Sequence, residues 1–432
     1  MTNKLPVGWC ECKLDDFVQI LDSERKPINA NERDERLKKA EGKPLYPYYG
    51  ATGQVGYIDD YLSDGEYVLL GEDGAPFLDP FKNKAYIVNG KFWVNNHAHI
   101  LKGFGSISNQ FICYWLNSVS YRPYVSGTTR LKLNQAKMKE IACNLPPLNV
   151  QKRIVAKIEE VFAKVDAGVE KLKSVAEDLK KYRQSVLHSA FTGKLHKTTD
   201  WKQVQLKDVC EVLGGYAFKS TDFSEFGYQI LRMGNIKPFT LNLNEKPVYI
   251  NNLNKNLVDK YLLQTNDIVI TLTGTRRKRD YGYVVLIKED KHLLLNQRLA
   301  RVRPLKNINA LYLAYALQSE PYQTQFFSYE TGNVGQGNVS MKALTDEKIF
   351  IPSLPEQEKI VEGIEKRFAV ADKLEEAVSN SLKQAEELKQ SILKKAFGGR
   401  LVPQDPNDEP AQILLDRIKA EKSTQLKKRK RK

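Results

Sequence analysis

Two long segments of the chain match each other without a gap, and this internal repeat limits how the chain can fold. Residues 151–163 read QKRIVAKIEEVFA and residues 357–369 read QEKIVEGIEKRFA, an offset of 206 (357 − 151). The same offset relates residues 184–195 to residues 390–401. A register kept over about fifty residues indicates a duplicated structural unit.

Both segments have the spacing of a long amphipathic helix. Apolar residues recur every three or four positions over several heptads, which is typical of a coiled coil. One such stripe could pack on its own domain, but two equivalent stripes can bury each other in a single rod. The positions expected on these stripes, in the helix pair or against partners, are Ile154, Ile158, Val165, Leu172, Leu179, Ile360, Ile364, Phe368, Leu374 and Leu388.

Prolines and glycines indicate where these helices begin and end. Proline-rich leads at residues 145–148 and 351–355 favour a fresh helix start. Gly193 and Gly398-Gly399 stand where the helices should end. A helix of ~40 residues would be ~60 Å long. The expected parts are a first globular block (1–148), a helix (149–195), a second block (196–355), a helix (356–400) and a C-terminal segment with a basic tail (401–432).

The two globular blocks repeat more weakly. Trp9-x4-Leu14-x-Asp16 reappears as Trp201-x4-Leu206-x-Asp208, an offset of 192 (201 − 9). Short apolar runs at residues 65–71 and 266–273 predict strands. Helices are expected at residues 108–119 and 308–318, before the proline-rich leads. The expected fold class is mixed α/β (α+β), with two globular domains alternating with two long helices.

The charge balance favours a polyanionic partner. Lys and Arg number 67 against 52 Asp and Glu, a formal net charge of +15. Nucleic acid fits better than an acidic membrane surface, because no apolar run approaches the ~20 residues of a membrane span. The five cysteines are odd in number and scattered, which argues against a disulfide framework and for a cytoplasmic protein. Cys10-x-Cys12 lacks a second pair that would complete a metal site, so no metal is expected.

Six short sequence motifs accompany the repeat, at residues 48–61, 65–74, 95–100, 230–236, 295–300 and 401–411. Their order, combined with the gapless repeat, resembles the specificity subunits of type I restriction-modification enzymes over essentially the whole chain. The resemblance implies two target recognition domains, each reading one half of a bipartite site in double-stranded DNA. It implies that each recognition domain folds like the small recognition domain of certain adenine methyltransferases. It also implies that the long helices pair antiparallel as a ruler between the half-sites.

The resemblance also implies partners. Two modification (methyltransferase) subunits would dock on the chain and bring S-adenosylmethionine, and restriction subunits would add ATP-driven translocation and cleavage with Mg²⁺. No cofactor is expected on this chain itself. A role in phage defence through DNA methylation and restriction follows from the same resemblance.

Basic, amide and hydroxyl side chains in loops are the candidates for reading DNA, because such groups pair with phosphates and base edges. The densest group is the connection 273–282, for which a solvated charged turn is the plain alternative. The candidates of the first block are Tyr48, Tyr49, Thr52, Asn95, Asn96, His97, Thr128, Thr129, Arg130 and Lys132. Those of the second block are Arg232, Asn235, Thr273, Thr275, Arg276, Arg277, Lys278, Arg279, Tyr281, Asn296, Gln297, Arg298, Gln336 and Asn338.

Two further features have simpler interpretations. His97 and His99, if both lie on a strand, would share one face, but no further zinc ligands are obvious nearby, so a hydrogen-bonded role is expected. The six basic residues at 427–432 are expected to be disordered and to add non-specific attraction to DNA.

The motifs of an enzyme are missing from the sequence. There is no Gly-x4-Gly-Lys-Ser/Thr phosphate loop. Asp79-Pro80-Phe81 only faintly resembles a methyltransferase motif, and Glu72-Asp73 lacks the spacing of a nuclease site. A non-catalytic binding subunit is therefore expected, with a self-contained DNA methyltransferase or nuclease as the alternative and a structural adaptor as the third possibility.

Overall fold

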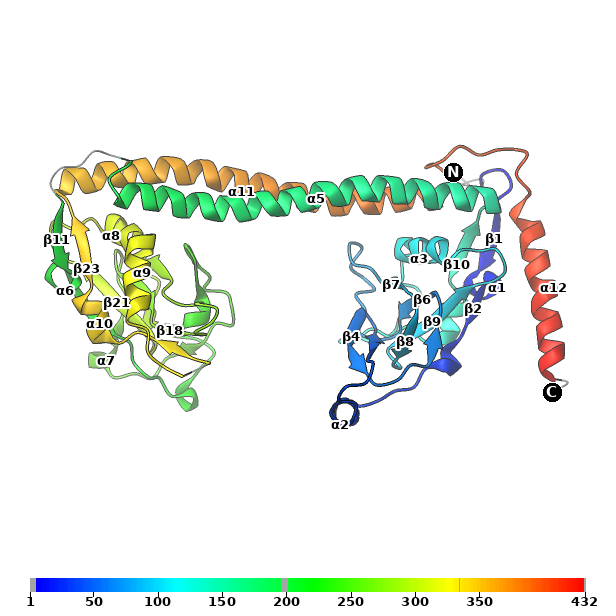
Figure 1. Ribbon diagram of the computed structural model, residues 1–432, viewed down its shortest axis with the longest axis horizontal. Helices are drawn as coiled ribbons and strands as arrows, with labels where there is room; N and C mark the ends of the chain where they lie inside the picture. Colours follow the sequence, from blue (N-terminus) through cyan, green and yellow to red (C-terminus); the bar gives the residue numbers. More distant parts are fainter. Residues whose placement is uncertain (1–4, 196–200, 334, 431–432) are drawn as a thin grey trace. The chain divides into compact units, whose positions relative to one another are not determined.

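The chain divides into two compact units, each built on one globular block. The structure is a computed structural model that describes residues 5–195, 201–333 and 335–430. Unit 1 comprises Met1–Leu172 and Ser379–Lys432, and unit 2 comprises Lys173–Val378. Each unit also holds half of each long helix, α5 (Leu148–Phe191) and α11 (Leu354–Phe397), which run side by side in Figure 1.

Unit 1 is built on two four-stranded sheets, ordered β2-β9-β6-β7 and β4-β3-β8-β5, while β1 pairs with β10. Its main core packs helix α3 against the first of these sheets, with Phe17, Phe111 and Leu116 fully buried. The elements before α5 are β1 (Cys10–Lys13), α1 (Leu14–Phe17), β2 (Val18–Ile20), η1 (Asp22–Glu24), α2 (Ala30–Lys39), β3 (Tyr46–Gly50), β4 (Gly53–Ile58), β5 (Ser63–Asp64), β6 (Tyr67–Gly71), β7 (Ala85–Val88), β8 (Lys91–Val94), β9 (Ala98–Gly103), α3 (Asn109–Ser118), α4 (Gln135–Lys139) and β10 (Ala142–Leu145).

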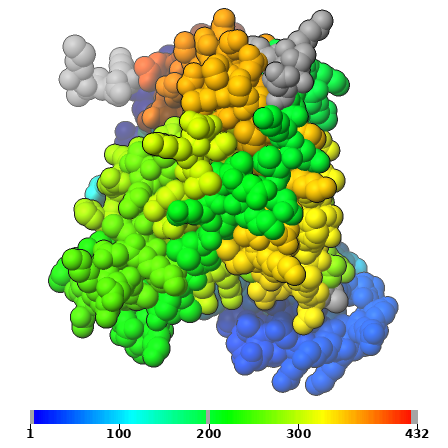
Figure 2. Space-filling model, turned by 90° about the vertical axis from the view of Figure 1, so that its left-hand side faces the viewer, coloured from blue at the N-terminus to red at the C-terminus, as the bar shows by residue number. Residues whose placement is uncertain are grey.

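Unit 2 repeats this plan with a four-stranded sheet β12-β21-β17-β19, a three-stranded sheet β16-β13-β20 and the pairs β11-β23, β14-β15 and β18-β22. Figure 2 shows one face of the unit, with α11 in orange above its green and yellow block. The elements between the long helices are β11 (Lys202–Gln205), α6 (Leu206–Val209), β12 (Cys210–Gly214), η2 (Ser220–Asp222), β13 (Tyr228–Leu231), η3 (Met233–Asn235), β14 (Ile236–Lys237), β15 (Thr240–Leu241), β16 (Tyr249–Ile250), α7 (Lys255–Tyr261), β17 (Ile268–Thr271), β18 (Thr273–Gly274), β19 (Val284–Leu286), β20 (Leu293–Leu295), β21 (Leu299–Pro304), α8 (Ala310–Gln318), α9 (Glu320–Ser328), β22 (Gly337–Asn338), α10 (Met341–Asp346) and β23 (Lys348–Ile351).

The weaker repeat of the globular blocks corresponds to the same helix-capping arrangement near the start of each block. Asp16 accepts a hydrogen bond from the Lys13 amide at 2.7 Å, and Asp208 accepts one from the Gln205 amide at 3.1 Å. Each carboxylate thus caps a one-turn helix whose leucine is fully buried. The strands expected at residues 65–71 and 266–273 form β6 and β17, and the expected helices form α3 and α8, so these predictions are confirmed.

Both long helices end in the same glycine motif. Gly193 and Gly399 have positive φ angles of 75° and 70°. The amide after each glycine donates back five residues, from Lys194 to the Ser189 carbonyl at 3.0 Å and from Arg400 to the Lys395 carbonyl at 2.8 Å. This is the Schellman arrangement, which needs a left-handed residue best supplied by glycine. The predicted helix ends are confirmed.

Within each unit the two helices pack antiparallel. In unit 1 the start of α5, with Ile154 and Ile158, packs on the end of α11, with Ile392 and Leu393. In unit 2 the end of α5 joins the same core as the start of α11. The half-helices therefore bury their apolar stripes against each other, as the heptad spacing predicts.

A basic side chain bridges the helix pair at the equivalent position of each unit. In unit 2 Arg183 lies 2.5 Å from Asp372 and stacks on the Phe368 ring at 4.9 Å. In unit 1 Lys389 pairs with Asp166 and lies 5.1 Å from the Phe162 ring. Positions 183 and 389 are related by the repeat offset of 206 (389 − 183). Because each pair joins one helix to the other, it favours one register over its neighbours.

The part of each apolar stripe that is buried between the helices is narrower than the sequence spacing predicts. Leu374 and Leu388 are about half exposed, and Val165 and Leu172 are only partly buried. Of the two alternatives for Leu374 and Leu388, the helix pair of this chain does not bury either side chain, and contact with a partner stays a prediction. Two helices can cover only a narrow seam of each other, so part of a broad stripe stays at the surface.

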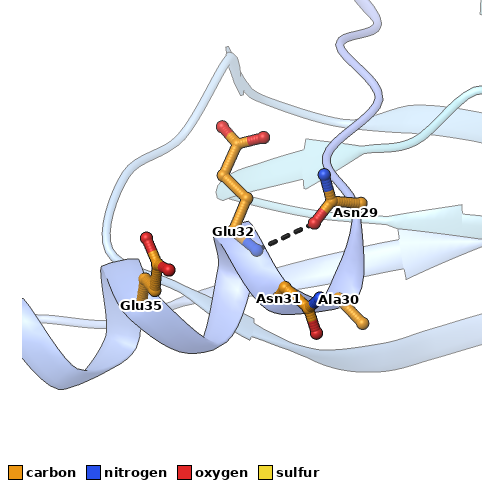
Figure 3. Close-up of a pocket in the computed structure, with 5 residues that line it drawn as sticks. All are labelled: Asn29, Ala30, Asn31, Glu32 and Glu35. Atoms are coloured by element: carbon orange, nitrogen blue, oxygen red, sulfur yellow. Dashed lines mark hydrogen bonds between the residues drawn. The ribbon is translucent and has the colours of Figure 1, made fainter.

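Two helices of unit 1 have no counterpart in the described part of unit 2. Asn29 lies just before helix α2, and its side chain accepts a hydrogen bond from the Glu32 amide at 2.8 Å beside a shallow pocket (Figure 3). Helix α12 (Ala411–Lys430) packs its first turns into the core of unit 1 through Leu414, Leu415 and Ile418. The expectation that the basic tail is disordered is wrong for residues 427–430, which continue α12, and Arg431 and Lys432 lie outside the described residues. None of the described helices is long and apolar enough to cross a bilayer.

Candidate nucleic-acid interface

In each unit the same pair of segments is joined by a backbone hydrogen bond at the end of an interior strand of the main sheet. In unit 1 the Leu133 amide donates to the Glu72 carbonyl at 2.7 Å, which joins the segment before α4 to the end of β6. In unit 2 the Val339 amide donates to the Leu272 carbonyl at 2.9 Å, which joins the segment before α10 to the end of β17. Most of the loop residues singled out from the sequence lie around these two junctions.

At the unit 1 junction three polar side chains, Asp73, His97 and Arg130, meet. One oxygen of Asp73 lies 2.6 Å from Nδ1 of His97 and accepts a hydrogen bond from Arg130 at 2.9 Å. Beside them Lys132 lies 3.2 Å from Glu72. Thr128 and Thr129 are exposed in the same loop. The structure thus brings together candidates that are more than thirty residues apart in the sequence.

The turn after β3 borders the same surface. The Asn95 amide donates to the Tyr49 carbonyl at 3.1 Å, and the Asn95 side chain accepts from the His97 amide at 2.8 Å. Thr52 and Asn96 are exposed here. We name this surface, formed by residues 49–53, 72–74, 95–97 and 126–132, the unit 1 loop surface.

A buried network supports the unit 1 loop surface from below. His99 is fully buried, with Nδ1 2.7 Å from Asp22 and Nε2 2.9 Å from the Leu133 carbonyl. Burial opposes ionisation of Asp22, but the hydrogen bond from His99 and the charges of His99 and Arg25 outweigh it and lower the pKa of that carboxyl. The expectation that His97 and His99 share a strand face is wrong, because His97 lies in the turn before β9 and binds a different carboxylate.

The unit 2 junction carries the densest basic group. Strand β18 pairs with β22 through Thr273 and Asn338, so the connection 275–282 lies against the segment 330–333. Arg276 donates from Nε to Glu330 at 3.1 Å and from Nη1 to the Gly332 carbonyl at 3.1 Å. These contacts hold one arginine of the basic group in a fixed orientation.

The other basic residues of this connection are less restrained. Arg277 and Lys278 are exposed and form no ion pair among the residues that the structure describes. Arg279 is exposed, has a positive φ of 47°, and lies 4.9 Å over the Phe327 ring. The turn itself is closed by Asp280, which accepts from the Thr275 amide at 2.5 Å.

Two more groups border the unit 2 junction. The Leu272 amide donates to the carbonyl of Arg298, which has a positive φ of 71°, and Gln297 is exposed beside it. Asn296 bridges to Tyr216, an aromatic residue that is 39% exposed. We name the surface of residues 216, 273–279, 296–298, 330–333 and 335–338 the unit 2 loop surface. Gln336 is exposed on this surface, and Arg232 lies nearby, bonded to the Lys246 carbonyl at 2.7 Å.

Several sequence candidates are too buried to touch a ligand and instead support the loops. Asn95 and Asn235 hold turns through their side chains, and Tyr281 donates to Glu330. Tyr48 packs in a small core with Ile58 and Trp93. These five buried candidates are Tyr48, Asn95, Asn235, Thr273 and Tyr281.

Sequence reasoning missed three residues of the loop surfaces. Asp73 and Glu330 are acidic and do not themselves attract phosphates, yet Asp73 accepts a hydrogen bond from Arg130 and Glu330 accepts one from Arg276. Tyr216 follows Gly214-Gly215, and a Cβ on Gly215 would lie 1.9 Å from the Asn296 carbonyl oxygen. A glycine pair before an aromatic was the one available signal for this close approach.

Comparison with known proteins gives one consistent result. The chain matches the family described as type I restriction modification DNA specificity domain over residues 6–177 and 198–384. The EcoDI specificity subunit of Escherichia coli is 24% identical over 449 residues, covering 97% of this chain and 96% of that protein. The EcoKI specificity subunit of Escherichia coli K12 is 28% identical over 342 residues, covering 73% of this chain and 72% of that protein.

A solved structure from work on complex assembly and conformational transition of the type I R-M system has the same fold. Its TM-score to this chain is 0.61 at 17% identity, and the match covers 92% of this chain and 100% of the other. The repeated blocks, the paired long helices and the family match agree. This chain belongs to the type I restriction-modification DNA specificity family.

Proposed function

We propose that this chain reads a bipartite site in double-stranded DNA, one half-site through each loop surface. The observation that carries the proposal is that the same loop junction, at the end of an interior strand, occurs in both halves of a repeated chain. Basic, amide and hydroxyl side chains converge at both junctions, and these are the groups that bind phosphates and base edges. Clustered Lys and Arg in a chain of net charge +15 supply the long-range attraction to DNA.

The paired helices serve in this proposal as the spacer between half-sites. Each helix of 44 residues is about 66 Å long at 1.5 Å per residue. That length is under two turns of B-DNA at about 34 Å per turn. A rigid spacer raises the effective concentration of the second recognition domain once the first has bound.

Catalysis in this proposal belongs to partner subunits in the cytoplasm. Two modification subunits bring S-adenosylmethionine, and restriction subunits bring ATP and Mg²⁺, while this chain selects the site. The repeat supports two equivalent docking positions, because the same helix halves and the same glycine-ended termini occur twice. The half-exposed Leu374 and Leu388 lie on the helix pair, where a docked subunit would cover them.

Sequencing the modified adenines in cells that express this chain with its modification subunit tests the proposal. A split motif with two fixed half-sites and an undefined spacer is the expected result. A single uninterrupted motif, or no modification with a demonstrably active partner, would contradict it. A control chain with the unit 2 loop surface exchanged for that of a relative should change one half-site and keep the other.

A further inference from the structure

The basic connection of unit 2 contains two electrostatically different kinds of residue. Arg276 forms an ion pair with the Glu330 carboxylate, whereas Arg277 and Lys278 form no ion pair among the described residues. All three are exposed and adjacent in sequence. We propose that Arg276 is the base-reading residue of this loop and that Glu330 positions it, while Arg277 and Lys278 bind phosphates without regard to sequence. The proposal rests on the proposed function and assigns roles within it.

The first step is the restraint on Arg276. Its side chain is 44% exposed, while the Glu330 side chain is only 10% exposed. Glu330 binds Nε, and the Gly332 carbonyl binds Nη1. Two of the five N–H groups of the guanidinium are therefore used within the protein, and its outer end keeps donors for a ligand. A fixed planar fork is the geometry that pairs with O6 and N7 of guanine.

The second step is the restraint on Glu330 itself. Its other carboxylate oxygen accepts a hydrogen bond from the buried Tyr281 hydroxyl. A Cβ on Gly337 would lie 2.4 Å from that hydroxyl and 2.5 Å from Glu330 Oε1, so only glycine leaves room for the contact. Carboxylate, hydroxyl and glycine come from three segments of unit 2 and hold the arginine as one assembly. A solvated surface turn would need none of these restraints.

The third step concerns charge. Arg276 and Glu330 together are neutral, so the pair adds little attraction beyond the Debye length of about 8 Å at physiological salt. Arg277 and Lys278 keep their full charge and release counterions when they meet phosphates. An arginine whose charge is neutralised but whose orientation is fixed contributes more to discrimination between bases than to general affinity. Arg277 and Lys278 contribute more to general affinity than to discrimination.

The experiment uses the full chain in complex with its modification subunits and duplex DNA carrying the half-sites found by adenine sequencing. Affinities are measured for the cognate duplex, for every single base-pair substitution in both half-sites and for a scrambled duplex, each at several salt concentrations. Arg276→Ala is expected to weaken cognate binding about 10- to 100-fold. The variant should lose discrimination at one base pair, and its loss of scrambled binding should be much smaller than its loss of cognate binding, because the uncompensated charge of Glu330 is its one general effect.

The paired variant Arg277→Gln/Lys278→Gln is the matched control in the same loop. It is expected to weaken cognate and scrambled binding alike and to reduce the salt slope by about two, close to one per lost phosphate contact. Discrimination between bases should persist. The half-site read by the other unit is an internal control for assembly of the complex in every variant.

Glu330→Gln tests whether Glu330 positions Arg276 or only stabilises the loop. It is expected to free the Arg276 charge, so that scrambled binding strengthens and the salt slope steepens by about one, while discrimination falls at the base pair that Arg276→Ala identifies. Tyr281→Phe keeps the carboxylate but removes one of its restraints, and should act in the same direction more weakly. Equal losses of cognate and scrambled binding in Arg276→Ala, or unchanged discrimination in Glu330→Gln, would overturn the assignment. A wild-type complex with no bipartite preference would instead overturn the proposed function.

Discussion

Glu347 is a buried carboxyl without a normal hydrogen-bond partner, and it makes the stability of unit 2 depend on pH. The side chain is 0% exposed, and neither oxygen forms a hydrogen bond among the described residues. The Tyr322 hydroxyl is adjacent but not in hydrogen-bonding geometry. Burial raises the pKa of Glu347 from 4.5 to about 8. The equivalent position in unit 1, 206 residues earlier (347 − 141), is Ile141.

The size and sign of the effect follow from that pKa. Below about pH 4.5 both the folded and the unfolded chain hold the proton, and ionisation costs nothing. As the pH rises, the unfolded state releases the proton and the folded state does not, so the free energy of unfolding falls by about 1.4 kcal/mol per pH unit. At pH 7 the loss is about 3 kcal/mol, and it stops growing above about pH 8.

Glu347→Gln removes the ionisation and keeps the shape. We expect the variant to be more stable than the wild type by a margin that widens from pH 5 to pH 8. Because the change lies in unit 2 alone, the assay is local: hydrogen exchange of the amides in α10 and β23, with both proteins compared at each pH. Ile141→Glu is the mirror control, which should give unit 1 the same pH dependence. A margin that stays constant with pH would refute the reasoning.

Three further changes test the packing of the loops and helices. Gly337→Ala should weaken discrimination by the unit 2 half-site and lower stability by about 1–3 kcal/mol, whereas Gly335→Ala, whose Cβ meets nothing within 4 Å, should do neither in the same binding and melting assays. Arg183→Met should cost only about 1 kcal/mol in a denaturant titration, because Asp372 and Glu375 are well exposed and its stacking on Phe368 is largely kept by Met; a loss of several kcal/mol would contradict this. Inserting four residues, about 6 Å, into α5 should change the half-site spacing found by adenine sequencing and leave the half-sites unchanged; unaltered spacing would count against the ruler.

The helices and their ends were predictable because their causes are local. A heptad stripe, a proline lead and a terminal glycine act over a few residues, and each is visible in the sequence. The burial of Leu374 and Leu388 was not predictable in the same way. Which side of a broad stripe is covered depends on the partner helix, and α5 covers only part of α11.

The loop surfaces were only half predictable for a related reason. Basic and amide residues in turns predict a candidate DNA-binding surface by composition, and most of these residues lie at the two junctions. Tyr48 and Tyr281 face the core instead, which the sequence leaves open because an aromatic residue near a turn can take either place. The pairing of Arg276 with Glu330 joins residues 54 positions apart, so no local pattern reveals it.

The two junctions place their acid and their arginine on opposite segments. In unit 1 the acid, Asp73, follows the sheet strand and the arginine, Arg130, stands in the loop before α4. In unit 2 the arginine, Arg276, follows the strand and the acid, Glu330, stands in the loop before α10. The backbone hydrogen bond that closes each junction is the same, so the exchanged charges are held on the same backbone frame. Under the proposed function, specificity can therefore change through side chains that meet across the junction, while the strand ends and the helix pair keep their geometry.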